Sequence, residues 1–509
     1  MIKMKIKRVC AERPPLLLRW QILIYATVTA AICVGQHLLT KAGPLQMVKT
    51  ACGMVLLLLV YVILGATLPF LRPKRLSSAE KEILSEDSVY GAGSGERVLT
   101  IEKNRDALYW RLRLFRNAQR SIIYSTMDFR NDHSGVDVLS ALFAAAERGV
   151  RVRLLVDGLR SLAFLQSREF RAFVLHENIE VRGYNPLNLR KPWRLQARLH
   201  DKYIIVDDEI YTIGGRNTND LFLGEYSRRR RNIDRELLIW DAEKQGASLV
   251  VLRQYFETLW ASGWCRRIPM KRTLSLERGR EALRNHYRWL REAYPEAFAP
   301  LDLWKITVPA AKVTLLHNAQ TPYKKPPLLW KTMMKVLATG EDVLIQTPYL
   351  ILDSAMERDL AALTSVPDRK VRVVTNAVET GANAWGCADY LNRKPRILRT
   401  GIELFECVSP HSCHLKSILV DERLSLVGSF NFDMRSCYLD TELMLAVDCP
   451  VLNQELRQYA QKGIEKSRHV TAAGLIGVGS AYQQVSLSVV KYLLYTILRL
   501  LIFPIRYLL

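Results

Sequence analysis

Two stretches of the chain carry the same pattern, HDKYIIVD at residues 200–207 and HLKSILVD at residues 414–421. After six further residues each runs into a short polar segment, GGRN at residues 214–217 and GSFN at residues 428–431. The spacing of His, Lys, Asp, Gly and Asn is identical in the two copies. Ordinary residue frequencies do not produce such a coincidence, so the sequence predicts a fold built from two related halves.

The residue types of this pattern suit the cleavage of a phosphodiester. A neutral imidazole can attack phosphorus and carry the phosphoryl group covalently, and a protonated imidazole can donate a proton to the departing alkoxide. One copy has one histidine and cannot fill both roles, so we expect the two copies to meet at one site. In an extended run alternate side chains project to the same side. His200 and Lys202 can therefore hold one phosphate together, as can His414 and Lys416.

Other polar residues of the two copies complete the predicted site. Asn217 and Asn431 supply amide N–H groups to phosphate oxygens, next to the charge of the lysines. Gly215 stands where the second copy has Ser429, so a hydroxyl contact to phosphate is available in one half only. The predicted catalytic set is His200, Lys202, Asp207, His414, Lys416 and Asp421, of which we interpret the two aspartates as braces of the motif.

Each copy is followed by a pair of acids, Asp234-x-Glu236 in the first half and Asp440-x-Glu442 in the second. A catalytic histidine needs an acceptor on its other ring nitrogen to fix the tautomer. We predict that Glu236 and Glu442 orient the histidines. The alternatives are that Asp234 or Asp440 does so, or that all four acids pair with arginines.

The chain resembles the phospholipase D superfamily, whose defining element is this His-Lys-Asp motif in two copies. Within it, the chain is most similar to bacterial cardiolipin synthases of the C type, from about residue 90 onward. The resemblance rests on GVRVRLLVD at 149–157, GGRN at 214–217, and GSFNFDMR at 428–435 followed by Thr441-Glu442. It implies a covalent phosphohistidine mechanism, a lipid phosphodiester substrate, His200 as nucleophile and His414 as general acid and base.

The repeat extends beyond the motifs to short apolar, β-branched runs typical of buried strands. These runs occur in matched pairs, at 121–126 and 342–347, at 151–156 and 370–375, and at 179–182 and 402–405. A helical stretch from Val136 to Arg148 lies between the first two runs of the first half. The predicted fold is α/β, with two duplicated phospholipase D-like domains packed around one active site and preceded by a transmembrane helical hairpin.

The predicted domain boundaries follow composition. They are 1–79 for a membrane region, 80–265 for the first domain, 266–300 for a connector, 301–485 for the second domain and 486–509 for an amphipathic membrane-associated tail.

Two apolar stretches in the membrane region, residues 20–40 and 51–71, are each long enough to cross a bilayer. A secretory signal peptide is the alternative for the first, and the second stretch favours membrane retention. Lysines and arginines cluster before the first stretch and after the second. The positive-inside rule then places both ends, and the catalytic domains, on the cytoplasmic side of a bacterial inner membrane.

Residues 486–509 combine apolar residues with a narrow basic stripe, in which Lys491, Arg499 and Arg506 share one helical face. Such a segment is typical of an interfacial helix on anionic lipid. A core helix of the catalytic domain is an equal alternative.

Composition supports an anionic partner, because the formal net charge is +23. Nine cysteines form no metal-binding spacing, and no acidic pair is placed to hold Mg²⁺. Since Lys202, Lys416, Asn217 and Asn431 can meet the phosphate charge, we expect no metal and no other cofactor.

The function predicted from these features is a membrane-bound cardiolipin synthase that transfers a phosphatidyl group to phosphatidylglycerol. Phosphatidylglycerol and phosphatidylethanolamine are both candidate phospholipid donors. One alternative is a phospholipase D-type hydrolase that uses water as the acceptor. The other is a membrane-tethered nucleic-acid-binding protein or nuclease, which the apolar segments disfavour. The sequence leaves the exact acceptor, the oligomeric state and any protein partner open.

Overall fold

The structure is a computed structural model, and it describes residues 44–78, 80, 89–161, 167–227, 231–244, 246–270, 276–381 and 383–509. Its chain divides into two compact units, Met1–Arg72 with Asn188–Gln196, and Pro73–Leu187 with Ala197–Leu509. The second unit contains both copies of the repeated motif, so the site lies within one unit.

The first unit is built on the apolar helix α3 (Pro44–Thr67), which ends in the 3-10 turn η1 (Leu68–Phe70). Within it, Cys52–Phe70 has a mean hydropathy of 2.3 and is long enough to cross a membrane. It is one candidate span in the described part of the chain. The other predicted span, residues 20–40, lies outside the described residues, so the hairpin itself stays a prediction.

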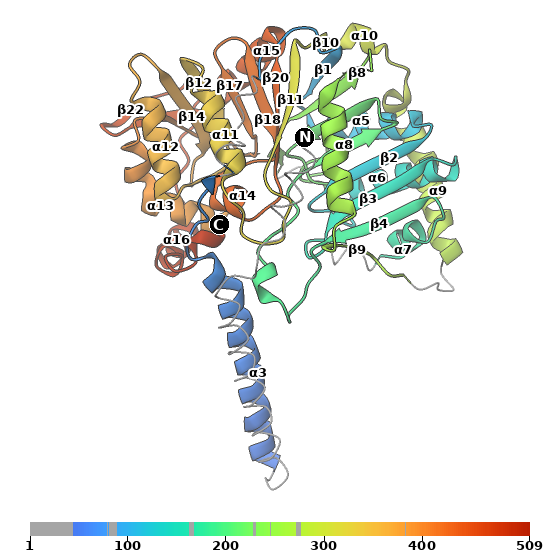
Figure 1. Ribbon diagram of the computed structural model, residues 1–509, viewed down its shortest axis with the longest axis horizontal. Helices are drawn as coiled ribbons and strands as arrows, with labels where there is room; N and C mark the ends of the chain where they lie inside the picture. The colour runs from blue at the N-terminus through green and yellow to red at the C-terminus, as the bar shows by residue number, and fades with distance from the viewer. Residues whose placement is uncertain are drawn as a thin grey trace. The chain divides into compact units, whose positions relative to one another are not determined.

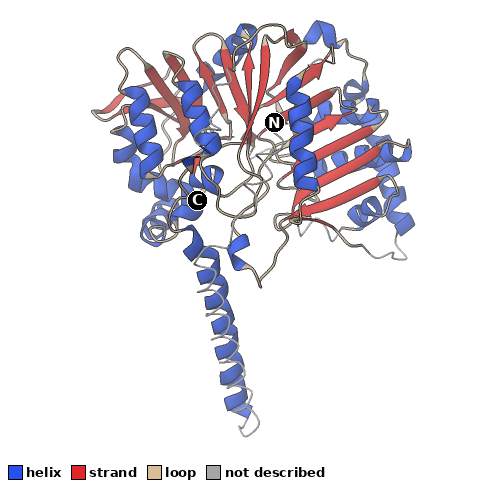
Figure 2. Ribbon diagram, viewed as in Figure 1, coloured by secondary structure: helices blue, strands red, loops and turns tan. Residues whose placement is uncertain are grey.

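The second unit contains two nine-stranded sheets (Figures 1 and 2). The first has the order β10-β1-β8-β6-β5-β2-β3-β4-β9 and the second the order β11-β20-β18-β17-β12-β14-β15-β21-β22. The strands of the first sheet are β1 (Glu96–Ile101), β2 (Ser121–Thr126), β3 (Arg151–Asp157), β4 (Ile179–Tyr184), β5 (Tyr203–Val206), β6 (Ile210–Gly214), β8 (Glu236–Asp241), β9 (Cys265–Arg267) and β10 (Val308–Pro309). Those of the second are β11 (Lys312–His317), β12 (Asp342–Gln346), β14 (Lys370–Asn376), β15 (Glu403–Cys407), β17 (Ser417–Val420), β18 (Leu424–Gly428), β20 (Leu443–Asp448), β21 (Ser467–Thr471) and β22 (Gly474–Val478).

The two sheets repeat the same pairing pattern. In each, three neighbouring strands run parallel, β2, β3 and β4 in the first sheet and β12, β14 and β15 in the second. The neighbours on the other side are antiparallel hairpin strands, β5 and β6 in one and β17 and β18 in the other. The matched apolar runs of the sequence coincide with the parallel strands, so the predicted mixed α/β duplication is confirmed.

Helices cover the sheets on both faces (Figure 2). The first half has α5 (Asn104–Asn117), α6 (His133–Glu147), α7 (Arg168–Val174), α8 (Ala247–Trp260) and α9 (Leu276–Ala293). The second has α11 (Leu328–Leu337), α12 (Ser354–Thr364), α13 (Ala384–Leu398), α14 (Met434–Tyr438), α15 (Pro450–Ile464) and α16 (Val489–Leu501). The short helix α10 (Leu303–Ile306) leads into β10.

One hydrophobic core joins the halves. It contains side chains of α8 and α15 together with residues of both sheets, such as Ile205 of β5 and Leu419 of β17. Helix α8 of the first half packs on β11, and α15 of the second half packs on β1. Because each half covers part of its partner's sheet, the two halves are held in a fixed relation at the motifs.

The C-terminal helix α16 packs against α13, and its orientation differs from that of an interfacial helix whose basic stripe lies on lipid. The predicted basic stripe faces protein, where Lys491 Nζ donates to the Glu379 carbonyl at 2.7 Å and Arg499 Nε donates to Asn392 Oδ1 at 2.7 Å. These polar partners on the catalytic unit attract the basic face, so the apolar face points outward.

Candidate active site

The two motif histidines lie where an extended segment enters a central antiparallel strand. His200 and Lys202 directly precede β5, and His414 and Lys416 directly precede β17. The motif is therefore strand only from its fourth residue, although the segment before it is extended. The short strand β16 (Ser412–Cys413) ends one residue before His414.

Each of these segments pairs with the other half of the molecule. Leu199 forms a parallel bridge with Thr441, and β16 pairs in parallel with β7 (Asn232–Ile233). In both places the residue that follows the paired residues is a histidine on the motif segment and an acid on the segment from the other half. The crossed pairing thus brings His200 to Glu442 and His414 to Asp234.

The hydrogen bonds at these two places are closely similar. His200 Nδ1 lies 2.8 Å from Glu442 Oε1, and the His200 backbone N–H donates to Thr441 Oγ1 at 3.0 Å. His414 Nδ1 lies 2.6 Å from Asp234 Oδ2, and its backbone N–H donates to the Ile233 carbonyl at 2.7 Å. A carboxyl group that accepts from Nδ1–H leaves Nε2 with its lone pair, as a nucleophile or base requires.

The prediction for Glu236 is wrong, because its carboxylate is bound to Arg111 with contacts of 2.6 and 2.9 Å. The sheet register explains the error. Gly214 pairs with Glu236, whereas the equivalent Gly428 pairs with Met444. The acid two residues earlier, Asp234, is therefore the counterpart of Glu442. The shared Asp-x-Glu pattern invited an alignment shifted by two residues.

Gly215 and Ser429 fit these different acids. The Ser429 hydroxyl donates to Glu442 Oε2 and accepts from the Leu443 N–H at 3.1 Å. A Cβ at Gly215 would lie 2.5 Å from both carboxylate oxygens of Asp234. Ser429, predicted to bind phosphate, instead contacts the acid that orients His200, and Gly215 leaves room for the acid that orients His414.

Both motif lysines are buried beside the histidines. Lys416 Nζ lies 2.6 Å from His414 Nδ1 and 3.7 Å from Asp234 Oδ2. Lys202 Nζ donates to the His200 carbonyl. Burial lowers the pKa of Lys416 to about 8 and lowers that of Lys202, with nearby acids opposing the change in both cases. A substrate phosphate would restore the charge that burial disfavours.

Burial and the lysines also keep both histidines neutral. Desolvation, then Lys202, holds the pKa of His200 well below 6.5. Desolvation, then Lys416, lowers the pKa of His414 to about 4, with Asp234 opposing. Lys416 also lowers the pKa of His200, although it belongs to the other half, so the charges of both halves act on one site.

The two carboxyl groups differ in charge. Burial raises the pKa of Glu442 to about 8, against the opposing effect of Lys202. Burial also disfavours the ionised form of Asp234, but Lys416 and His414 outweigh it and bring the pKa to about 2. At neutral pH Asp234 is therefore ionised, whereas Glu442 is mostly protonated.

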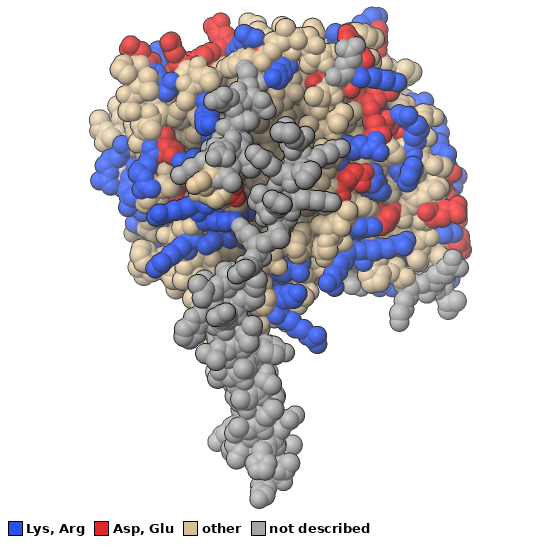
Figure 3. Space-filling model, viewed as in Figure 1, with Lys and Arg blue, Asp and Glu red and all other residues tan. Residues whose placement is uncertain are grey.

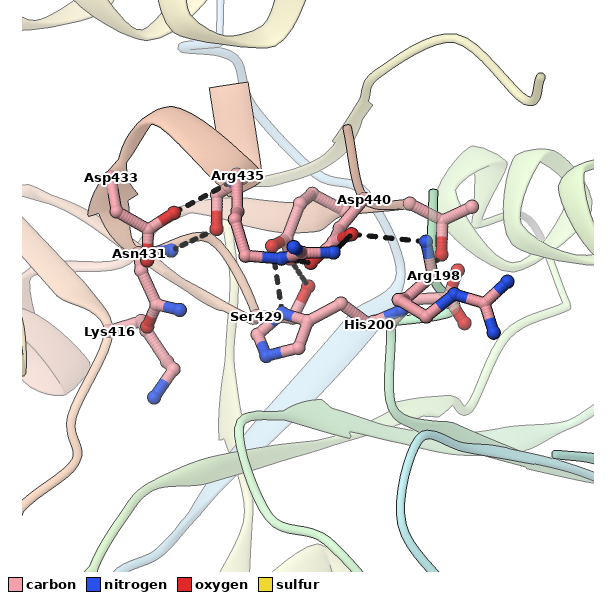
Figure 4. A network of polar contacts seen from close by, with 12 residues as sticks. Arg198, His200, Lys416, Ser429, Asn431, Asp433, Arg435 and Asp440 are labelled. Atoms are coloured by element: carbon pink, nitrogen blue, oxygen red, sulfur yellow. Dashed lines mark hydrogen bonds and ion pairs between the residues drawn. The ribbon is translucent and has the colours of Figure 1, made fainter. Parts of the chain in front are cut away.

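Asn217 and Asn431 occupy equivalent places at the ends of the two motifs. Each is nearly buried, and neither Oδ1 atom has a hydrogen-bond partner among the described residues. Figure 4 shows Asn431 beside Lys416. Unpartnered buried amide oxygens at a phosphate-handling motif fit a ligand that brings its own donors.

Asp207 and Asp421 lie in the turns after β5 and β17 with φ of 54° and 47°. Asp207 accepts the backbone N–H groups of Gln119, Arg120 and Ser121 at 2.7 to 2.8 Å. Asp421 accepts those of Glu341 and Asp342, both at 2.9 Å. Both aspartates therefore brace the turn against the neighbouring parallel strand, and their contacts are to backbone rather than to the histidines.

Two arginines at the junction of the halves, the buried Arg235 and the partly buried Arg435, were not predicted. Arg235 bonds the Gln346 side chain at 3.0 Å and the Ser417 hydroxyl at 2.8 Å, both across the junction, as well as Glu102 in its own half. The sequence offered only its place between the two acids as a signal.

The second arginine, Arg435, binds Asp440 through Nε at 3.0 Å and through NH2 at 2.9 Å. Asp440 Oδ1 in turn accepts the backbone N–H of Arg198 at 3.1 Å (Figure 4). Arg198 is two residues before His200. Asp440, an alternative orienting acid in the sequence, thus acts on the segment that carries His200 rather than on an imidazole.

The described residues hold no group of three or more His, Cys, Asp or Glu side chains arranged to bind a metal ion.

The chain is similar to known proteins in sequence and in fold. Residues 112–260 and 335–463 match the family described as cardiolipin synthase, phospholipase D-like domain. The chain belongs to this family. The two matched segments fall on the two sheets, one in each half. The expected membership of the phospholipase D superfamily is therefore confirmed, and the protein is a phosphatidyltransferase enzyme of that superfamily.

Individual relatives agree with the family assignment. Cardiolipin synthase C of Escherichia coli K12 is 28% identical over 406 residues, which cover 70% of this chain and 82% of the relative. Cardiolipin synthase A of Erwinia tasmaniensis is 24% identical over 345 residues, 66% of this chain and 62% of the relative. The crystal structure of phosphatidylserine synthase from Haemophilus influenzae superposes with a TM-score of 0.59 at 17% identity, over 84% of this chain and 99% of that one, which shows a common fold.

Proposed function

We propose that this cardiolipin synthase family member makes cardiolipin, by moving a phosphatidyl group onto phosphatidylglycerol through a phosphohistidine intermediate. The observation that carries the proposal is the crossed pair of histidines. Each is buried and neutral, each has a carboxyl group of the other half on Nδ1, and each has a lysine beside it. One site therefore offers a nucleophile, a proton donor and two cations for a phosphodiester.

In the first step His200 Nε2 attacks the phosphorus of a phospholipid. The bond from phosphorus to the headgroup oxygen breaks. His414, protonated to the imidazolium when the anionic phosphodiester binds beside it, gives its Nε2 proton to that oxygen and becomes neutral. The electrostatics support this division of roles. Burial and Lys202 hold the pKa of His200 well below its usual value, which keeps its lone pair available. The ionised Asp234 stabilises an imidazolium at His414.

In the second step the roles reverse at His414. Its neutral imidazole takes the proton from a hydroxyl of phosphatidylglycerol, and the resulting oxygen attacks phosphorus. The bond between phosphorus and His200 Nε2 breaks, and cardiolipin is released. Lys202 and Lys416 hold positive charge against the phosphate oxygens in both steps.

Two phospholipids are candidates for the donor of the phosphatidyl group. Phosphatidylglycerol as donor would release glycerol, and phosphatidylethanolamine would release ethanolamine. The hydrolytic alternative uses the same two histidines with water as the acceptor, and its product is phosphatidic acid.

The test is the lipid profile of a bacterium that lacks cardiolipin and expresses this chain, with the His200→Ala variant as a control. Cardiolipin from the intact chain alone would support the proposal. Phosphatidic acid without cardiolipin would identify a hydrolase and overturn the transferase assignment. Purified enzyme given donor lipid with labelled glycerol or ethanolamine headgroups then identifies the donor, because the released alcohol carries the label.

We further propose that the protein resides in the bacterial inner membrane with the catalytic unit on the cytoplasmic side. The apolar surface of α3 and the basic residues flanking the predicted spans support this placement. Protease added to intact inner-membrane vesicles of known orientation tests it, since inside-out vesicles should expose the catalytic unit and right-side-out vesicles should protect it.

A further inference from the structure

The C-terminal helix α16 presents an apolar face to the outside of the catalytic unit. Its inner face is buried on the protein through Tyr495 and Leu498, and Ile502 follows at its end. On the outer side the exposed fractions of Val489, Val490, Leu493, Ile497, Leu500 and Phe503 are 73, 76, 56, 57, 78 and 79%. A contiguous apolar surface of this kind marks a site that something covers.

The charges around this face indicate what covers it. The sequence contains no acidic residue from 466 to 509. Helix α13, on which α16 packs, carries Arg393 and Arg396, which share Glu357, and Lys394, which pairs with Glu406. The exposed Arg399 directly follows α13, so positive charge remains in excess beside the apolar face. Figure 3 shows Lys and Arg side chains gathered on the region that α13 and α16 occupy in Figure 1. An apolar face bordered by cations is complementary to acyl chains beneath anionic headgroups.

The end of this tail is joined to the active site. Arg506 is buried and bonds Asp389 at 2.9 and 3.1 Å, which locks the tail onto α13. The 3-10 turn η5 (Arg506–Leu508) begins at this arginine. The Leu508 carbonyl accepts from the Arg435 guanidinium at 2.9 Å, and the Leu509 carbonyl accepts from the Arg435 backbone N–H at 2.7 Å. Arg435 holds Asp440, which holds the segment that carries His200.

We propose that the outer apolar face of α16 inserts into the leaflet that supplies the lipid substrate, and that the tail thereby fixes the position of the active site at the membrane surface. This rests on the proposed function in that the substrate is a membrane phospholipid. The basic stripe on the inner face holds the helix to the protein, and the apolar face provides the contact with lipid. The tail is therefore a lipid-docking platform rather than a cationic contact.

The first experiment measures depth of insertion. The full chain is reconstituted into vesicles of phosphatidylglycerol and phosphatidylcholine whose acyl chains carry bromine, which quenches tryptophan. Leu500→Trp adds a probe to the exposed face. The matched control is Val451→Trp, because Val451 is 59% exposed on α15, which lies well apart from α16 in Figure 1.

We expect the fluorescence added by Leu500→Trp to be quenched several-fold more by deep bromines than that added by Val451→Trp. Equal, weak quenching at both positions would overturn the proposal. This readout needs no turnover, so it stands or falls separately from the assignment of the reaction.

The second experiment measures the consequence for catalysis with Leu500→Glu and the control Val451→Glu. We expect Leu500→Glu to lower turnover of vesicle-bound lipid by about tenfold while leaving turnover of a short-chain phospholipid, dispersed below its micelle concentration, unchanged. Unchanged vesicle activity, or equal loss with both substrates, would contradict the proposal. If Leu500→Glu instead halves the mass of the protein in detergent, the face joins two copies of the chain, and the membrane assignment is wrong.

Discussion

The two halves of the catalytic unit share a sheet and a motif but differ in the acid that each supplies. The first half supplies Asp234 with Gly215, and the second supplies Glu442 with Ser429. The shorter acid lies near Lys416 and is ionised, whereas the longer one is held with its pKa at about 8. Duplication thus supplies two histidines in matching places, and small changes behind them give the histidines different electrostatic environments.

The largest expected effect is common to both halves. His200→Ala and His414→Ala should each lower cardiolipin formation by about a thousandfold or more, because the nucleophile or its proton partner is lost. Lipid analysis of membranes in which each variant accumulates normally measures this. Near-normal product from either variant would mean that one half works alone.

Replacing each orienting acid by its amide should affect activity unequally in the two halves. Asp234→Asn removes an ionised acceptor and should cost about a hundredfold in kcat, a typical upper effect of an orienting partner. Glu442→Gln replaces a carboxyl group that is already mostly protonated at pH 7, so we expect a loss of about tenfold or less. Steady-state kinetics gives the loss of kcat in each variant. Equal losses would remove the proposed electrostatic difference.

Exchanging the residues behind the acids should have a smaller and unequal effect. Gly215→Ser would place a Cβ against both Asp234 oxygens and should reduce activity by about tenfold, by shifting the acid from His414. Ser429→Gly removes one hydroxyl from Glu442 and should cost only a few-fold. The measurements are the activity and the thermal unfolding of the Gly215→Ser and Ser429→Gly variants. A greater loss from Ser429→Gly would reverse this ranking.

The pH dependence of stability should differ between the halves. The pKa of Glu442 is raised from 4.5 to about 8. Its contribution to the free energy of unfolding is therefore present below pH 4.5 and is lost as pH rises through about 8. The pKa of Asp234 is lowered from 3.8 to about 2, so its contribution is present above pH 3.8 and lost as pH falls towards 2. Melting temperatures of the wild type and Glu442→Gln should therefore move apart by a few degrees in favour of the variant between pH 5 and 9. Parallel curves would contradict the raised pKa.

The smallest expected effect is that of a chelator. Lys202 and Lys416 supply the positive charge of the site, so EDTA should leave turnover unchanged. An assay with and without EDTA, followed by added Mg²⁺ or Zn²⁺, checks this. Activity that is lost with EDTA and restored by a metal would show that the lysines do not carry the phosphate charge alone.

The sequence predicted the duplicated strands and the motif residues well, because a repeat preserves spacing and the apolar runs report burial directly. It misassigned Glu236, because the acid that meets His414 is selected by pairing between the halves, and a local Asp-x-Glu pattern does not contain that register. It also predicted the basic stripe of the tail, but it left open whether the stripe faces lipid or the catalytic domain. The partners that hold the stripe, such as Asn392 and Asp389, lie about a hundred residues earlier in the chain.

The crossed contacts have a consequence for how such a protein can change over evolutionary time. Each half provides the acid for its partner's histidine, and β10 of the second half adds an edge strand to the first sheet. The chain is in effect a dimer whose subunits have been fused and have diverged. A loss in one half cannot be compensated by the other, because neither contains a complete histidine–acid pair. Two differently damaged chains could restore one working enzyme only by exchanging whole halves.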